Sequence, residues 1–69
     1  MRYTILAVEA IDPAGGDIDI FLDGDATAVV DGLVEGDSIL ITTDPLTQIV
    51  IGISNANTTV IVLIISWYY

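Results

Sequence analysis

Cysteine, histidine and lysine are absent from this chain of 69 residues, and Arg2 is its single basic residue. Without cysteine the chain forms no disulfide, and without cysteine or histidine it has no ligand set for structural zinc. A domain of this length hides only about 60% of the surface that its unfolded chain exposes, so its own core gives limited stability. Because these stabilising devices are missing, we expect association with further copies to supplement the core.

The shortage of basic residues also excludes one class of partner. Ten acidic residues against one arginine give a formal net charge of −9 at pH 7. A nucleic-acid-binding surface needs a cluster of lysine and arginine that replaces the counterions of the phosphates. We therefore expect no nucleic acid among the partners of this protein.

The side chains that usually carry catalysis are equally scarce. General acid–base chemistry in this chain would depend on a carboxyl group whose pKa is strongly raised in a closed pocket. Most of the acidic residues instead stand beside glycine in apparent turns, where water reaches them. We predict that the protein is not an enzyme.

Neither a secretion signal nor a membrane span is apparent. Glu9 and Asp12 interrupt the apolar run at the N-terminus, which a signal peptide would keep intact. Residues 45–69 carry no charge, but the polar and turn-favouring residues 54–59 divide them. A hairpin fits this stretch better than a transmembrane helix, so we expect neither secretion nor a membrane partner.

The chain does contain a regular series of turn signals between short apolar runs. Aspartate, asparagine, glycine and proline cluster at five places, where they favour turns. The six runs between them are rich in isoleucine, valine, threonine and aromatic residues, as strands are. They comprise residues 2–10, 17–22, 26–30, 38–42, 48–54 and 59–67. This pattern predicts a single all-β domain over residues 1–69, a small six-stranded antiparallel sandwich or barrel.

The order of apolar residues within the runs indicates which faces are buried. Ile18, Ile20 and Leu22 share one side of the second run, and the aspartates on the other side, which also holds Phe21, predict one buried and one solvent-exposed face. The isoleucines of residues 48–54 alternate in the same way. Residues 60–65 are apolar at every position, which is typical of a strand covered on both faces. In so thin a domain, we expect the second cover to come from another copy.

The end of the chain is therefore the predicted interface. The sequence closes with three aromatic residues, a type enriched in the cores of interfaces. The same aromatic residues could instead belong to an ordinary core or form a platform on which sugars stack. The predicted interface residues are Val60, Val62, Leu63, Ile64, Ile65, Trp67, Tyr68 and Tyr69.

Four aspartates around the second run offer a candidate calcium site. Asp17, Asp19, Asp23 and Asp25 provide hard oxygen ligands at spacings that calcium favours. Their order does not match an EF-hand loop, and the alternative is that all four are solvated turn residues. Calcium is the one cofactor that the sequence brings into consideration.

The turn between the third and fourth runs carries a family resemblance. Residues 32–41, with Gly36-Asp37 between two apolar segments, are followed by Asp44 and then by Gln48-Ile49-Val50-Ile51-Gly52. This order resembles small β-sandwich modules of tailed-phage structural proteins, namely capsid decoration or cement proteins and the C-terminal domain of distal tail proteins. The resemblance covers residues 18–69.

The resemblance implies a structural subunit of a virus particle. We expect a capsid cement or decoration protein that contacts copies of itself and a major capsid or other virion protein. Its location would then be the virion, assembled in the host cytoplasm. Two alternatives are a subunit of an extracellular filament completed by strand exchange, and a calcium- or carbohydrate-binding module.

Overall fold

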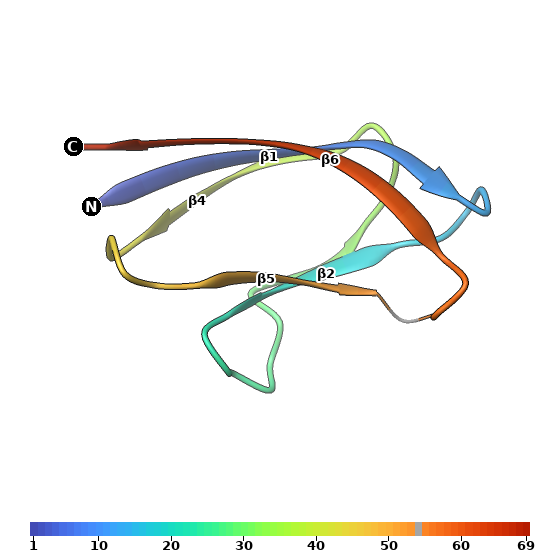
Figure 1. Ribbon diagram of the computed structural model, residues 1–69, viewed down its shortest axis with the longest axis horizontal. Helices are drawn as coiled ribbons and strands as arrows, with labels where there is room; N and C mark the ends of the chain where they lie inside the picture. The colour runs from blue at the N-terminus through green and yellow to red at the C-terminus, as the bar shows by residue number, and fades with distance from the viewer. Residues whose placement is uncertain (54) are drawn as a thin grey trace.

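The computed structural model describes residues 1–53 and 55–69, and over these residues the chain forms six strands (Figure 1). They are β1 (Arg2–Asp12), β2 (Ile18–Leu22), β3 (Val30–Leu33), β4 (Ser38–Thr43), β5 (Ile49–Ile53) and β6 (Thr59–Tyr68). All strand pairs are antiparallel, in two sheets that we call sheet A (β4-β1-β6) and sheet B (β3-β2-β5). The predicted six-stranded all-β fold is confirmed, in the form of a sandwich. No helix in the described part of the chain has the length and apolar character needed to cross a membrane.

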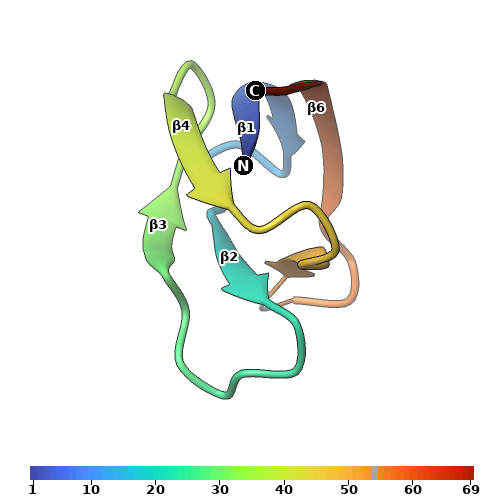
Figure 2. The same cartoon turned by 90° about the vertical axis from the view of Figure 1, so that its left-hand side faces the viewer.

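The two sheets lie over each other and enclose a small core. Figure 2 views the sandwich from one end, with β4, β1 and β6 side by side above β3 and β2. The connections from β1 to β2, β3 to β4, β4 to β5 and β5 to β6 each cross from one sheet to the other. The buried apolar residues come from both sheets and are Leu6, Val8, Ile11, Ile18, Ile20, Leu33 and Ile41.

A β-bulge in β1 explains an irregularity in its apolar pattern. Thr4, Leu6 and Val8 point into the core at every second position, whereas the next buried residue is Ile11. The register between β1 and β6 shifts between Val8 and Ala10, so Glu9 is an extra residue. One extra residue reverses the side to which the following side chains point, so Ile11 also reaches the core.

The third strand lies further along the chain than its sequence pattern predicts. The prediction of a strand at residues 26–30 is wrong, because β3 begins at Val30 and includes Asp31-Gly32. Gly32 has a φ of 75°, in the left-handed region, and it lies where the pairing of β2 and β3 is irregular. Its N–H donates to Asp19 Oδ1 over 3.0 Å. An apparent turn signal therefore serves as an irregularity inside a strand.

The other five predicted strands are confirmed, with ends that differ by one or two residues. The alternation predicted for β2 is also confirmed, since Ile18 and Ile20 are buried and Asp19 is turned away from the core. The predicted strand residue Ser54 lies outside the described residues.

Candidate assembly interface

The outer face of sheet A is covered with apolar side chains. The inward direction of Thr4, Leu6 and Val8 in β1 places the alternate residues on the outside. Opposite residues of paired strands share a face, so Ile5, which pairs with both Leu40 and Ile65, marks the same outer face on all three strands. Its apolar members are Tyr3, Ile5, Ala7, Ala10, Leu40, Ile61, Leu63, Ile65 and Trp67.

Much of this outer face is open to solvent. Leu40 and Ile61 are each 60% exposed, and Leu63 and Ile65 are each about half exposed. Single exposed apolar residues are common on proteins, but here they are neighbours across three paired strands. Contiguous apolar surfaces of this kind are typical of interaction sites.

The two broad faces of the sandwich differ in charge. β4 and β6 contain no charged residue, and the acidic residues of β1 are confined to Glu9 and Asp12 near one end. Sheet B carries Asp19 in β2 and Asp31 in β3, with Asp17 directly before β2. The protein therefore has an acidic side and a largely uncharged side.

Aromatic side chains extend the outer face of sheet A toward the chain ends. The rings of Tyr3 and Trp67 stack with their centroids 5.9 Å apart, and Tyr69 meets Tyr3 edge-on at 6.1 Å. The Tyr69 N–H donates to the carbonyl of Met1 over 3.0 Å, which holds the two ends of the chain together. Tyr69 is nevertheless 95% exposed, so most of its side chain remains in contact with solvent.

The residues predicted as interface divide between two sides of β6. Leu63, Ile65 and Trp67 lie on the outer face of sheet A. Val60 and Val62 point the other way and pack against the protein's own core. Ile64 and Tyr68 are also on the inner side, yet they are 48% and 65% exposed. Tyr69 follows the strand and is exposed.

Several members of this surface escaped the sequence prediction. Ile61 lies within a strand that the sequence predicts, on the same face as Leu63, and period-two alternation could have identified it. Ile5 and Leu40 come from other strands, and their place beside Ile65 follows only from the register of β1 with β4 and β6. A single sequence contains no signal for that register.

Arg2, the one basic residue of the chain, contributes hydrogen bonds that hold the fold together. The Arg2 guanidinium donates to the carbonyl of Pro45 over 3.4 Å and to the carbonyl of Thr47. These hydrogen bonds fasten the start of β1, in sheet A, to the connection that leads from β4 to β5 in sheet B. Two of its donors are therefore directed at backbone carbonyls.

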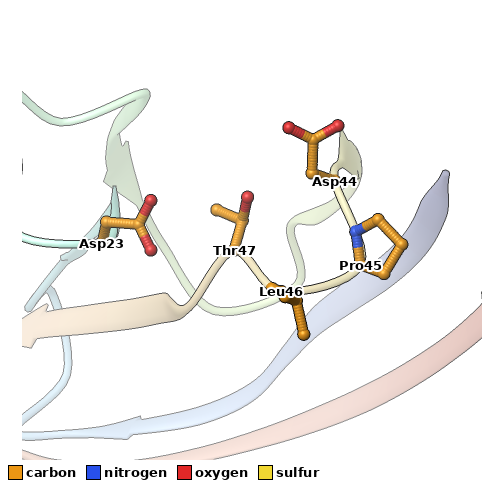
Figure 3. Close-up of a pocket in the computed structure, with 5 residues that line it drawn as sticks. All are labelled: Asp23, Asp44, Pro45, Leu46 and Thr47. Atoms are coloured by element: carbon orange, nitrogen blue, oxygen red, sulfur yellow. The ribbon is translucent and has the colours of Figure 1, made fainter.

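An open recess lies beside this connection. It has a volume of about 580 Å³ and is lined by Asp23, Asp44, Pro45, Leu46 and Thr47 (Figure 3). Asp23 joins the end of β2 to the residue before β5, because its Oδ1 accepts from the Gln48 N–H over 3.0 Å. Leu46 is 96% exposed, so the recess is a surface hollow and does not enclose a ligand-sized space.

The structure does not bring together the four aspartates predicted as calcium ligands. Asp17 and Asp19 lie at the start of β2, whereas Asp23 and Asp25 belong to the turn after its end. Within residues 1–53 and 55–69, no three acidic side chains gather in a way that would hold a metal ion. Asp19 and Asp23 are instead hydrogen-bonded to backbone N–H groups.

Asp19 and Asp31 form a coupled pair on the acidic side. The Gly32 N–H and the Asp31 carboxyl both hydrogen-bond to Asp19, and they lower the pKa of Asp19. The same hydrogen bond to Asp19, together with the negative charges of Asp19 and Asp17, raises the pKa of Asp31. Asp31 is therefore the member of the pair that keeps a proton longer as the pH rises.

Comparison with protein-family models, curated proteins and solved structures found no match for this chain. The resemblance to tailed-phage modules therefore stays a prediction.

Proposed function

We propose that this protein is a non-catalytic structural subunit that works as an assembly of copies held through the outer face of sheet A. The observation that carries the proposal is the exposure of Leu40, Ile61 and Leu63 on β4 and β6, two strands without charge that lie on either side of β1. Copies with a net charge of −9 repel each other, so an uncharged face is where they meet at least electrostatic cost.

The size of the protein supports a contact through a whole face. A stable interface buries about 800 Å² on each partner, and the total accessible surface of this protein is 4440 Å². The contact would therefore take about a fifth of the surface. A single loop does not supply so much area, whereas the side of a three-stranded sheet is of the right order.

Within this class, we propose a capsid cement or decoration subunit located in the virion. Its support is the resemblance of residues 18–69 to such modules, together with the difference between the two sides of the sandwich. An uncharged side suits contact with copies or with a major capsid protein, and an acidic side suits exposure to water.

A subunit of an extracellular filament is the second candidate. β6 lies at the edge of sheet A, and an unpaired edge strand is the feature that strand exchange requires. Electron micrographs of the purified protein separate the two candidates. We expect compact particles of uniform size, whereas long fibres would favour the filament.

The virion assignment has its own test. Particles from the natural source would be purified on a density gradient, and each fraction would be analysed by quantitative mass spectrometry. We expect the chain in the particle fractions at a constant ratio to the major capsid protein. Its absence from those fractions would contradict the cement role and leave the assembly untouched.

A further inference from the structure

We infer that β6 pairs antiparallel, along its free edge, with β6 of a second copy, so that two copies of sheet A become one continuous six-stranded sheet. The inference rests on the proposed assembly and adds to it a second contact, along the edge of sheet A, beside the contact through its outer face. The two-fold axis would pass between the two copies of Ile64.

The first observation is the unprotected edge of β6. Within the described chain, β1 is the one strand that pairs with β6, so its other edge presents unpaired backbone N–H and C=O groups. Proteins usually protect such edges with charged residues, proline or short strands. β6 is ten residues long and has neither a charged residue nor proline. The other edge strands have four to six residues, and β3 carries Asp31.

The second observation is that both sides of β6 expose apolar side chains. Leu63 on the outer side is 51% exposed, and Ile64 on the inner side is 48% exposed. A partner stacked on the outer face of sheet A would cover Leu63 and leave Ile64 open. A strand added at the edge alternates its side chains between both sides, so it covers both residues.

Charge explains why the occupant is a second copy in antiparallel orientation. β6 brings no charge to the contact, so copies of this acidic chain pair there without close repulsion. In sheet A the acidic residue Asp12 lies beside the start of β6, and Arg2 lies beside its end. Antiparallel pairing places Asp12 of one copy toward Arg2 of the other. Parallel pairing would instead place the two copies of Asp12 at the same end of the joint and the two copies of Arg2 at the other end.

Symmetry limits the register. In a two-fold antiparallel pair the residues opposite each other share a face, so the axis passes through a residue position. The longest such registers place either Leu63 or Ile64 opposite its own copy, and each pairs nine residues (59–67 or 60–68). Centring on Ile64 sets Leu63 against Ile65 and Ile61 against Trp67. The register centred on Leu63 instead places Trp67 opposite Thr59. The register centred on Ile64 therefore buries more apolar surface.

Single cysteine variants test this pairing directly, because the chain has no cysteine of its own. Under mild oxidation, we expect Ile64→Cys to give mainly disulfide-linked dimers, since the two Cβ atoms face each other across the joint. Leu63→Cys is the matched control. Its two copies would lie on a diagonal about 7–8 Å apart, too far for a disulfide, so we expect only a trace of dimer. Asp25→Cys, in the exposed turn after β2 of sheet B, gives the yield of dimer that arises from chance encounters in solution.

The outcomes separate this inference from the proposed function. If native mass shows an assembly but Ile64→Cys yields no more dimer than Asp25→Cys, or if Leu63→Cys yields the dimer instead, the pairing about Ile64 is wrong and the assembly stands. A chain that stays monomeric at all concentrations overturns both. Amide hydrogen exchange on the unaltered chain gives a second measurement. Exchange in β6 should slow as assembly proceeds, and unchanged exchange in the assembled protein would overturn the pairing.

Discussion

At the scale of single residues, Arg2 links sheet A to the connection that leads into sheet B. Arg2→Ala removes the guanidinium hydrogen bonds to the carbonyls of Pro45 and Thr47. We expect the free energy of unfolding to fall by about 1.5–3 kcal/mol, the range for hydrogen bonds that involve a charged group. Urea unfolding followed by circular dichroism measures the change.

Arg2→Lys is the matched control for charge. Lysine keeps the positive charge but lacks the planar fork that reaches two carbonyls, so its stability should lie between those of the parent and Arg2→Ala. Equal unfolding midpoints for the parent and Arg2→Ala would show that these hydrogen bonds do not contribute.

Asp31 makes the folded state depend on pH. Its pKa is raised in the folded protein by the hydrogen bond to Asp19 and by the charges of Asp19 and Asp17. The stability that protonated Asp31 contributes is complete below its ordinary pKa and is lost as the pH rises through the raised folded value. Asparagine does not ionise, and its amide still donates to Asp19. We therefore expect Asp31→Asn to be more stable than the parent at pH 7, with the difference vanishing in acid.

Unfolding of both proteins across a pH series checks this prediction. Asp25→Asn removes one negative charge at an exposed position and serves as the control for net charge. If Asp31→Asn and Asp25→Asn follow the same curve, the pair of Asp31 with Asp19 has no special role.

At the scale of elements, neighbouring residues of β6 should respond differently to the same substitution. Val62 packs against the core, so Val62→Asp places a carboxylate where burial costs about 3 kcal/mol or more. In a domain with so small a core, we expect this variant to unfold. Leu63 faces outward, so Leu63→Asp should change the free energy of unfolding by only about 0.5 kcal/mol. We expect that second variant to fold but not to assemble.

Circular dichroism combined with native mass distinguishes these outcomes. A Leu63→Asp variant that assembles like the parent would remove the outer face of sheet A from the interface. A Val62→Asp variant with unchanged stability would contradict the inward placement of that residue.

The elements also show what a single sequence predicts and what it does not. Strand β6 was predictable because an apolar run ending in aromatics is a strong local signal, and the turns at Gly36 and Asp44 separate the strands around them. The position of β3 was not, because Asp31-Gly32 has the composition of a turn and serves as a strand irregularity. The sequence predicted only the part of the candidate interface that lies in β6. Its β6 members follow from local pattern, whereas Ile5 and Leu40 join them through pairing between distant segments.

At the scale of the whole molecule, charge opposes association and the apolar face favours it. Salt screens repulsion between copies, with a screening length of about 10 Å at 0.1 M that falls to about 3 Å at 1 M. We expect association to strengthen from low to moderate salt, and also on mild acidification as carboxylates begin to protonate. Sedimentation velocity over a salt series measures the effect. Dissociation with rising salt would indicate that ion pairs hold the copies together.

The sandwich measures 36 × 23 × 14 Å, and few of its side chains are fully buried. A protein so thin places much of its apolar surface outside its own core, and the outer face of sheet A holds a large part of it. Assembly would bury that face and stabilise the fold by the same contact. Folding and association should therefore be linked, with a thermal midpoint that rises with protein concentration.

The native mass in solution tests the central claim most directly. Sedimentation equilibrium at neutral pH and moderate salt, over a wide range of protein concentration, would be compared with the chain mass of 7.3 kDa. We predict a discrete multiple of that mass, and Leu63→Asp should return it to the single-chain value. A monomer of 7.3 kDa across the whole range would contradict the account.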